Sequence, residues 1–329
     1  MKNSSSLLSI KNLKTVFQIE GKNATVVNNV SFDLSPGEIV GLVGESGCGK
    51  SVTALSLMRL VPDPPGKILG GEILLEGKDL LKLSEEEMEK VRGKEIGMIF
   101  QEPMTSLNPV LTIGKQLTEI LELHQNLEEE EAINEAINLL KLVGLPDPEL
   151  RIKNYPHQLS GGQRQRVMIA IALSCKPKIL IADEPTTALD VTIQAQILEL
   201  IQDLSKNLGT SVVLITHNLG ILARYAHRIN VMYAGHLIES GTTDQIFYSP
   251  KHPYTSGLLN SVPRLDLKTD LDLPTIPGEV PNLTEFDNGC AFRSRCSNPT
   301  EECINEKSEM KLIEIEPGHF VDKCCVNCK

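Results

Sequence analysis

"GLVGESGCGKS", residues 41–51, joins an apolar, strand-like run to the helix-like segment "VTALSLMRL". Glycine weakens both kinds of element, by roughly 0.5–1 kcal/mol relative to alanine, so this concentration of glycines indicates that the backbone must stay bare. Gly44-x-x-x-x-Gly49-Lys50-Ser51 fits the pattern of a phosphate-binding loop, in which backbone N–H groups converge on phosphate oxygens. A plain glycine-rich turn is the alternative, and the strand before and the helix after disfavour it. The stretch therefore predicts a site for a nucleoside triphosphate.

In a site of this kind a lysine ammonium group, a hydroxyl group and backbone N–H groups each bind a different part of the nucleotide and its Mg²⁺. Lys50 would neutralise the β- and γ-phosphates, and the Ser51 hydroxyl would bind Mg²⁺. Backbone N–H groups of the loop and of the helix start would surround the phosphates. The residues expected to contact the nucleotide are Gly44, Ser46, Gly47, Cys48, Gly49, Lys50, Ser51 and Val52.

Composition narrows the class of protein. With 329 residues, 41% of them hydrophobic and 23% charged, the chain is typical of a globular protein of one large or two ordinary domains. Its net charge of −11 weighs against a nucleic-acid partner. No apolar run approaches the roughly 18 residues of a membrane span, and the start "MKNSSSLLSIKNLKTVF" lacks the apolar core of a secretion signal. We expect the protein to stay in the cytoplasm.

Strand-like and helix-like segments alternate along the chain, which predicts an α/β fold with a mostly parallel sheet. "GEIVGLVG", "GGEILLEG", "IGMIFQ", "PKILIADEP" and "TSVVLITH" are the expected strands. Helical periodicity from Ile113 to about Val143, with "LEEEEA" as a turn and helix start, marks a helical insertion at about residues 102–165. We expect a P-loop ATPase domain over residues 1–248 and a C-terminal extension over residues 249–329, with "HPYT" and a cysteine-rich tail.

Two acids end one of the buried strands. In "ILIADEP", Asp183 and Glu184 follow the apolar residues 179–182. Alone, such a pair is often only a solvated strand exit. Beside a phosphate loop, Asp183 can hold Mg²⁺ through water and Glu184 can polarise the attacking water as a general base.

A second helix start has the features of an anion site. "LSGGQRQRVMIAIAL" places Ser160, Gly161 and Gly162 ahead of a long helix. Ser160 fits an N-cap, and the bare glycines leave helix N–H groups free for a phosphate. The alternative is an ordinary Ser-capped helix. It does not explain why Gln163 and two arginines follow.

Taken together, "LSGGQ", the phosphate loop and "ADEP" resemble the ATP-binding subunits of ABC transporters, over about residues 7–265. The resemblance implies further roles. Gln101 would contact Mg²⁺ and the attacking water, His217 the γ-phosphate, and Asp190 would belong to the loop that follows the acid pair. Phe17 would stack on adenine, for which its aromatic face suffices. Ser160, Gly161, Gly162 and Gln163 would contact the ATP of a partner subunit.

The resemblance also implies partners. Two ATPase subunits would face each other head to tail around two ATP molecules, and the second would be a similar, non-identical chain. Two membrane permease subunits would hold the pair on the cytoplasmic face of the cell membrane, and an extracellular solute-binding protein would act through them. "MTSLNP" and the apolar face of "IGKQLTEILEL" are candidates for contact with the permeases, or simply pack within the chain.

"HPYTSGLL" and "FQEPMTSLNP" resemble importers of dipeptides, oligopeptides and nickel, and leave the cargo open. The alternatives are a soluble ABC-type ATPase not coupled to transport, an importer subunit for another small solute, and an exporter subunit. Exporters are disfavoured by "HPYTSGLL". Nucleic-acid ATPases of this type are disfavoured by the acidic balance and the single cassette.

Six of the eight cysteines lie between residues 290 and 328, which in a reducing compartment favours metal binding over disulfides. Four thiolates suit either Zn²⁺ or an iron–sulfur cluster, and the resemblance to importer tails favours a [4Fe–4S] cluster. Cys325 and Cys328 compete with the last expected ligand. The expected ligands are Cys290, Cys296, Cys303 and Cys324. Four histidines without a partner pattern are expected at the surface: His124, His157, His252 and His319.

Overall fold

The computed structural model describes residues 6–102, 106–187, 189–262, 275–284, 289–300, 303 and 310–326. The chain forms two compact units. The first combines Met1–Leu34, Ile39–Leu81 and Thr216–Lys329, and the second combines Ser35–Glu38 and Lys82–Ile215. The described part of the expected C-terminal extension thus belongs to the same unit as the N-terminal strands.

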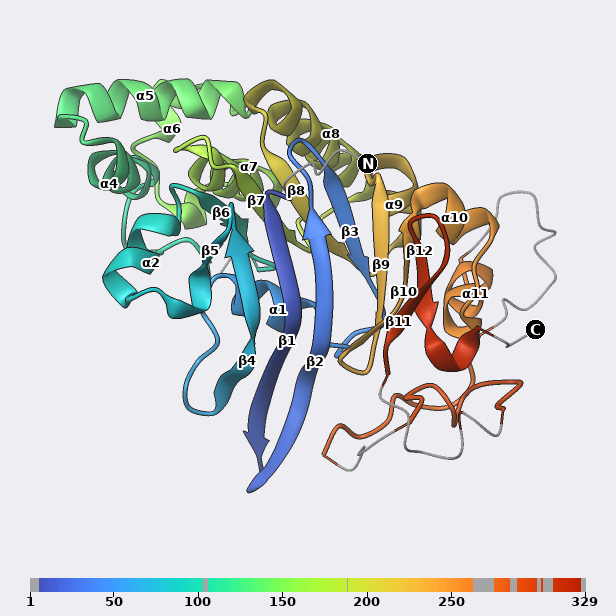
Figure 1. The fold of residues 1–329 in the computed structure, drawn as a ribbon. Helices are drawn as coiled ribbons and strands as arrows, with labels where there is room; N and C mark the ends of the chain where they lie inside the picture. Colours follow the sequence, from blue (N-terminus) through green and yellow to red (C-terminus); the bar gives the residue numbers. More distant parts are fainter. Residues whose placement is uncertain are drawn as a thin grey trace. The chain divides into compact units, whose positions relative to one another are not determined.

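An antiparallel sheet in the order β2-β1-β4-β5 begins the first unit. Its strands are β1 (Leu8–Ile19), β2 (Lys22–Leu34), β4 (Gly66–Leu75) and β5 (Lys78–Asp79). The neighbours β1 and β2 are the two long blue strands near the centre of Figure 1. Alternate residues such as Leu8, Ile10 and Val30 are buried, as expected of a sheet with one face on the core.

A second run of strands in this unit follows the order β11-β12-β10-β9-β3. Strand β3 (Ile39–Val43) is parallel to β9 (Arg228–Tyr233), and β10 (His236–Thr242) returns antiparallel to β9. A hairpin of β11 (Leu312–Glu316) and β12 (His319–Asp322), drawn in red in Figure 1, adds the tail to β10. The hairpin was not predicted. Among the described residues, the helices of this unit are α1 (Lys50–Leu57), α9 (Leu219–Tyr225), α10 (Thr243–Tyr248) and α11 (Pro253–Asn260), with single turns at Leu80–Lys82 and Lys323–Cys325.

Three parallel strands, in the order β8-β7-β6, form the centre of the second unit. They are β6 (Ile96–Ile99), β7 (Ile179–Asp183) and β8 (Ser211–Thr216). Every residue of the three is buried, which explains why their sequences are apolar except at the strand ends. Gly97 lets β6 approach α7, because a Cβ there would lie 2.1 Å from the carbonyl oxygen of Ala172.

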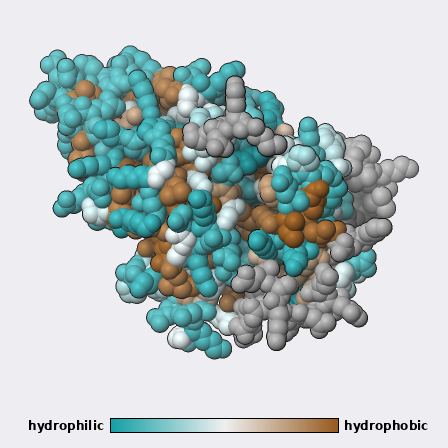
Figure 2. Space-filling model, viewed as in Figure 1, coloured by the Kyte–Doolittle hydropathy of each residue, from teal (hydrophilic) through white to brown (hydrophobic). Residues whose placement is uncertain are grey.

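The remaining helices of the second unit include the predicted insertion. The expectation of helix from Ile113 to about Val143 is confirmed as two helices, of which the second begins within "LEEEEA". Both pack against α7 and against each other. Figure 2 shows a mainly hydrophilic surface over them, with scattered apolar side chains. The helices are α2 (Glu85–Val91), α4 (Ile113–Gln125), α5 (Glu129–Leu142), α6 (Pro148–Arg151), α7 (Gly161–Leu173) and α8 (Val191–Leu208), with a single turn at Pro156–Gln158.

The predicted α/β fold with strand–loop–helix context around the phosphate loop is confirmed. The expectation of a mostly parallel sheet is wrong for "GGEILLEG", which lies in β4 and pairs antiparallel with β1 and β5. Among the residues that the structure describes, no helix has both the length and the apolar character needed to cross a bilayer. "MTSLNP", residues 104–109, lies partly outside the described residues, and only its part from Ser106 onward is described.

Candidate nucleotide site and cysteine centre

The phosphate loop connects β3 to α1 and is built around two glycines that no other residue can replace. A Cβ at Gly44 would lie 2.1 Å from the carbonyl oxygen of Met232, and one at Gly49, where φ is +102°, would lie 2.4 Å from that of Val26. Gly47, with φ +80°, has nothing within 4 Å of a built Cβ. Ser46 and Gly47 are exposed at the tip of the loop. The buried side of the loop is thus fixed by contact, and its tip is open to a ligand.

Lys50 lies inside the curve of this loop. Its ammonium group donates to the carbonyl oxygens of Gly44 at 2.8 Å and Glu45 at 2.9 Å, and the residue is 5% exposed. Cys48 is buried beside it, and burial raises the pKa of that thiol. Ser51 and Val52 follow, half-buried, in the first turn of α1. Phosphate oxygens are stronger acceptors for an ammonium group than peptide carbonyls, so the lysine is placed to exchange one set for the other.

Two other predicted ATP contacts lie in the first unit. Phe17 is half-buried in β1, opposite Ala24 of β2 and Gly66 of β4. A Cβ at Gly66 would lie 2.8 Å from the Phe17 ring, so that glycine makes room for the aromatic side chain. His217 follows β8 along the chain and is exposed. The roles in adenine and γ-phosphate binding stay predictions.

The second unit brings Gln101 and Glu184 together at the ends of neighbouring strands. The Gln101 side-chain amide donates to Glu184 Oε2 at 3.1 Å, and the Thr187 hydroxyl donates to the same oxygen at 2.9 Å. Glu184 has φ +45°, and such a backbone costs about 1–3 kcal/mol in a residue other than glycine. Asp183, the last residue of β7, is 4% exposed. An acceptor-only carboxylate held by two donors is positioned to take a proton from water.

The predicted second anion site is a capped helix start in the same unit. Ser160 is the exposed N-cap of α7 and accepts from the Gln163 N–H at 3.3 Å, while the Gln163 side chain accepts from the Ser160 N–H at 3.0 Å. Gly161 and Gly162 form the first turn. Asp190 is the exposed N-cap of α8, and its carboxylate makes no capping hydrogen bond. The contacts of these residues with nucleotide stay predictions.

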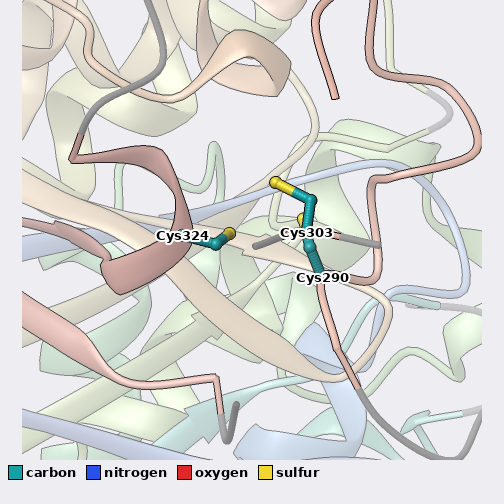
Figure 3. Close-up of side chains that lie close together, drawn as sticks. All are labelled: Cys290, Cys303 and Cys324. Carbon is teal, nitrogen blue, oxygen red and sulfur yellow. The ribbon is translucent and has the colours of Figure 1, made fainter. Parts of the chain in front are cut away.

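Three of the four predicted tail cysteines converge in the first unit, as Figure 3 shows. The sulfur atoms of Cys290, Cys303 and Cys324 all lie within 4.8 Å of one another, and all three residues are buried. Cys325 is buried as well, with its sulfur 3.7 Å from that of Cys324. Cys296 is half-buried and does not belong to this group. Cys328 lies outside the described residues.

Cys290 and Cys324 do not share their protons equally. Hydrogen bonds from Cys324, and then from Cys325, lower the pKa of Cys290 well below that of a free thiol. The pKa of Cys324 is raised, because its thiol is the donor to Cys290. Cys324 also donates to the Asp322 carboxylate at 3.3 Å. Thiolates are the species that bind metals, and a cation here would replace the protons that the sulfurs now share.

The expectation that His252 and His319 lie at the surface is wrong, since both are fully buried. The reason is Glu239 in β10, which is also fully buried. Its carboxylate accepts from His319 Nε2 at 2.8 Å, from the His252 N–H at 2.9 Å and from the Lys251 N–H at 2.7 Å. The interior carboxylate thus supplies the partner that sequence reasoning missed, whereas His157 is exposed and His124 half-buried.

Sequence reasoning also missed Glu45 and Arg295. The Arg295 guanidinium donates to both carboxylate oxygens of Glu45, which stands in the phosphate loop itself. No short motif contains both residues, because they are 250 positions apart. The only sequence indication is the position of Glu45, directly after the first glycine of the loop.

A glycine loop around a buried lysine, between a strand and a helix, is the phosphate-binding loop of a P-loop ATPase. Comparison with known proteins specifies the class further. A family model described as ABC transporter matches residues 27–187, and one described as the C-terminal region of oligopeptide/dipeptide transporters matches residues 238–303. The chain belongs to the ATP-binding subunits of ABC transporters, as the sequence motifs predicted.

Individual relatives agree with this assignment. The chain is 53% identical to the oligopeptide transport ATP-binding protein OppD of Bacillus subtilis (strain 168), over 96% of this chain and 87% of that protein. It is 54% identical to the dipeptide transport ATP-binding protein DppD of the same organism, over 98% and 94%. Among solved structures, the dimeric ATP-binding cassette MJ0796 in a post-hydrolysis state bound to ADP and Pi matches with a TM-score of 0.65 and 29% identity, over 72% of this chain and 98% of that one.

Proposed function

We propose that this chain powers the import of di- or oligopeptides through a membrane ABC transporter. The observation that carries the proposal is the pairing of a complete phosphate loop with a C-terminal region of the oligopeptide/dipeptide type. Identity above half to peptide-transport subunits, along nearly the whole chain, supports the same cargo class. Nickel import is the competing hypothesis for the cargo, which the sequence alone leaves open.

In the proposed cycle, ATP joins two ATPase subunits and hydrolysis releases them. Lys50 and the loop N–H groups bind the β- and γ-phosphates, Ser51 and Asp183 hold Mg²⁺, and Glu184 takes a proton from the attacking water. Gln101 orients that water through its contact with Glu184. Ser160, Gly161 and Gly162 of the second subunit close over the γ-phosphate. The dimeric state of the related cassette MJ0796 supports this arrangement.

Closure is a two-state equilibrium shifted by ATP. Moving such an equilibrium from mostly open to mostly closed requires about 5.5 kcal/mol of differential binding. A γ-phosphate shared by two helix starts and a lysine offers several charge-assisted hydrogen bonds, each roughly twice as strong as a neutral one. The second subunit is a similar chain, two permeases carry the pair on the cytoplasmic membrane face, and the solute-binding protein delivers cargo from outside.

The cargo is tested by uptake in cells that lack the chromosomal copy of this chain. Radiolabelled tripeptide uptake should fall to background in the deletion strain and return with the intact chain, but not with Glu184→Gln. Nickel-63 uptake, measured in the same strains, is the matched control. Peptide uptake that does not depend on the chain, together with nickel uptake that does, would overturn the peptide assignment.

We further propose that the tail thiols hold a [4Fe–4S] cluster. Three buried sulfurs within 4.8 Å fit a thiolate-liganded centre, and Cys296 or Cys325 would supply the fourth ligand. A single Zn²⁺ is the second candidate, because tetrahedral bonds of about 2.3 Å place thiolates about 3.8 Å apart, which suits so compact a group. When bound, either group cross-links a tail that has little core of its own.

Metal analysis of protein purified without oxygen separates the two candidates. A cluster should give a brown protein that absorbs at about 400 nm and contains iron and sulfide in equal amounts. One zinc per chain in a colourless sample would refute the cluster and assign the site to Zn²⁺. Protein that contains neither metal, even after reconstitution, would refute the centre altogether.

A further inference from the structure

Arg295 makes an unusually complete set of contacts with the phosphate loop. Its two terminal nitrogens donate to the two oxygens of Glu45, at 2.7 and 3.1 Å. The other three N–H groups donate to Tyr233 Oη at 3.4 Å, to the carbonyl oxygen of Ile276 at 3.1 Å and to that of Pro277 at 2.9 Å. A guanidinium has five N–H donors, and here each has an acceptor. The Arg295 side chain is 5% exposed and that of Glu45 is 29% exposed, so a buried guanidinium holds a carboxylate that reaches the surface.

Glu45 is a part of the loop on which the lysine also depends. Its N–H donates to the Tyr254 hydroxyl at 2.9 Å, and its carbonyl oxygen accepts from Lys50 at 2.9 Å. The carboxylate, the N–H group and the carbonyl oxygen of Glu45 therefore all form hydrogen bonds. A shift of Glu45 would alter the positions of the Lys50 ammonium group and of the neighbouring loop N–H groups.

The turn that carries Arg295 begins at Cys290, one of the three cysteines whose sulfur atoms converge. The backbone carbonyl oxygen of Cys290 accepts from the Arg293 N–H, and that of Phe292 accepts from the Arg295 N–H, so residues 290–295 form a tight, hydrogen-bonded turn. Phe292 packs edge-on against Tyr233, with ring centroids 5.3 Å apart, and against Tyr254 at 5.5 Å. The position of the guanidinium thus depends on a turn whose first residue is one of the three converging thiols.

We propose that Arg295 is a positioning residue for the phosphate loop, and that it couples the cysteine centre to nucleotide affinity. With the thiols occupied, the turn holds Arg295 on Glu45 and the loop keeps the shape that phosphates require. With the thiols empty, the turn loosens and the affinity for nucleotide falls. Coupling of this kind is reciprocal, so bound nucleotide also strengthens retention of the metal. The coupling rests on the metal centre proposed above, whereas the positioning role does not.

The positioning role is tested by nucleotide affinity of the full chain, measured at equilibrium with a fluorescent ATP analogue and Mg²⁺. Arg295→Met should weaken binding on the order of tenfold, and Arg295→Lys should recover only part, because an ammonium group cannot replace the bidentate contact. Arg293→Met removes the same charge from the same turn and should leave affinity within about twofold. An Arg295→Met chain that binds as tightly as the unaltered one overturns the proposal.

A second variant keeps the test valid if loss of Arg295 disturbs folding. Glu45→Gln changes one atom of a partly exposed side chain, and the doubly substituted chain should bind no more weakly than Arg295→Met alone, since both changes break one contact. Fully additive losses would show that Arg295 acts elsewhere, and would refute the positioning role.

The coupling is tested on the same chain before and after metal removal by chelation. Stripping should weaken nucleotide binding about tenfold in the unaltered chain and leave Arg295→Met unchanged. Equal losses in both chains would mean that stripping acts without Arg295, which overturns the coupling. A chain that never contains metal refutes the coupling and the metal centre together, while the Arg295→Met result still decides the positioning role.

Discussion

Glu239→Gln should loosen the attachment of the tail hairpin to β10. The carboxylate of Glu239 is fully buried and accepts three hydrogen bonds, from Lys251, His252 and His319. An amide offers one oxygen where the carboxylate offers two. If that oxygen takes the place of Oε1, the His252 N–H faces an amide donor and is left without an acceptor. His319 Nε2 and the Lys251 N–H then both keep the remaining oxygen as their acceptor, because both contact Oε1 in the unaltered chain.

The magnitude follows from this accounting. One buried N–H without an acceptor costs about 1–3 kcal/mol, and replacing charged by neutral hydrogen bonds at the two remaining donors costs about 1 kcal/mol more. We expect a loss of about 2–4 kcal/mol in the local opening free energy of the hairpin. That corresponds to amide exchange about 30- to 1000-fold faster at Val321, whose strand pairs with β10 opposite Glu239.

Hydrogen exchange read by mass spectrometry of the tail measures this effect. Glu314→Gln is the matched control, because it makes the same chemical change at an exposed position of the same hairpin. There the Glu314 carboxylate accepts from the Gly318 N–H at 2.9 Å. Exchange in Glu239→Gln that stays within about threefold of this control would show that the buried carboxylate does not attach the hairpin.

Three further changes test the nucleotide site. Glu184→Gln should keep ATP binding and lower turnover by about 10²–10³, measured as phosphate release; turnover at the parental rate would exclude Glu184 as the base. Gly44→Ala should lower the free energy of unfolding by about 1–3 kcal/mol, because its methyl group would collide with the Met232 carbonyl; an unchanged melting temperature would contradict the observed approach. Ser160→Ala should remove the cap of α7, at about 1 kcal/mol, and reduce ATP-induced dimers in size-exclusion chromatography; if dimers persist at the same nucleotide concentration, this helix start does not contact the shared phosphate.

The parts that sequence reasoning predicted are those whose information is local. The strand, glycine loop and helix around Lys50 follow one another within a few residues, and so do β7 and its acid pair. The contact between Gln101 and Glu184 spans 83 positions, but parallel pairing of β6 with β7 brings the two strand ends together. The sequence assigned a role to each of these residues but did not predict their contact, because neither motif contains the order of the strands.

The parts that sequence reasoning missed depend on long-range packing. "LIEIEPGHFVD", residues 312–322, alternates polar and apolar residues around a Pro-Gly turn, and this pattern could have predicted the hairpin. The burial of His252 and His319 could not be predicted, because it depends on Glu239, which lies in a strand before either of them. Nor could the ion pair of Glu45 with Arg295, since neither residue belongs to a recurring spacing that joins the loop to the tail.

The hairpin has a consequence for solubility. Without β12, strand β10 would end its sheet with a row of unpaired backbone groups, a template on which strands of other chains can add. With the hairpin in place the outermost strand is β11, which is five residues long and carries Glu314 and Glu316. Short, negatively charged margins of this kind resist strand addition. The tail therefore protects the ATPase from self-association, and chains truncated before residue 310 should precipitate where the intact one stays dispersed.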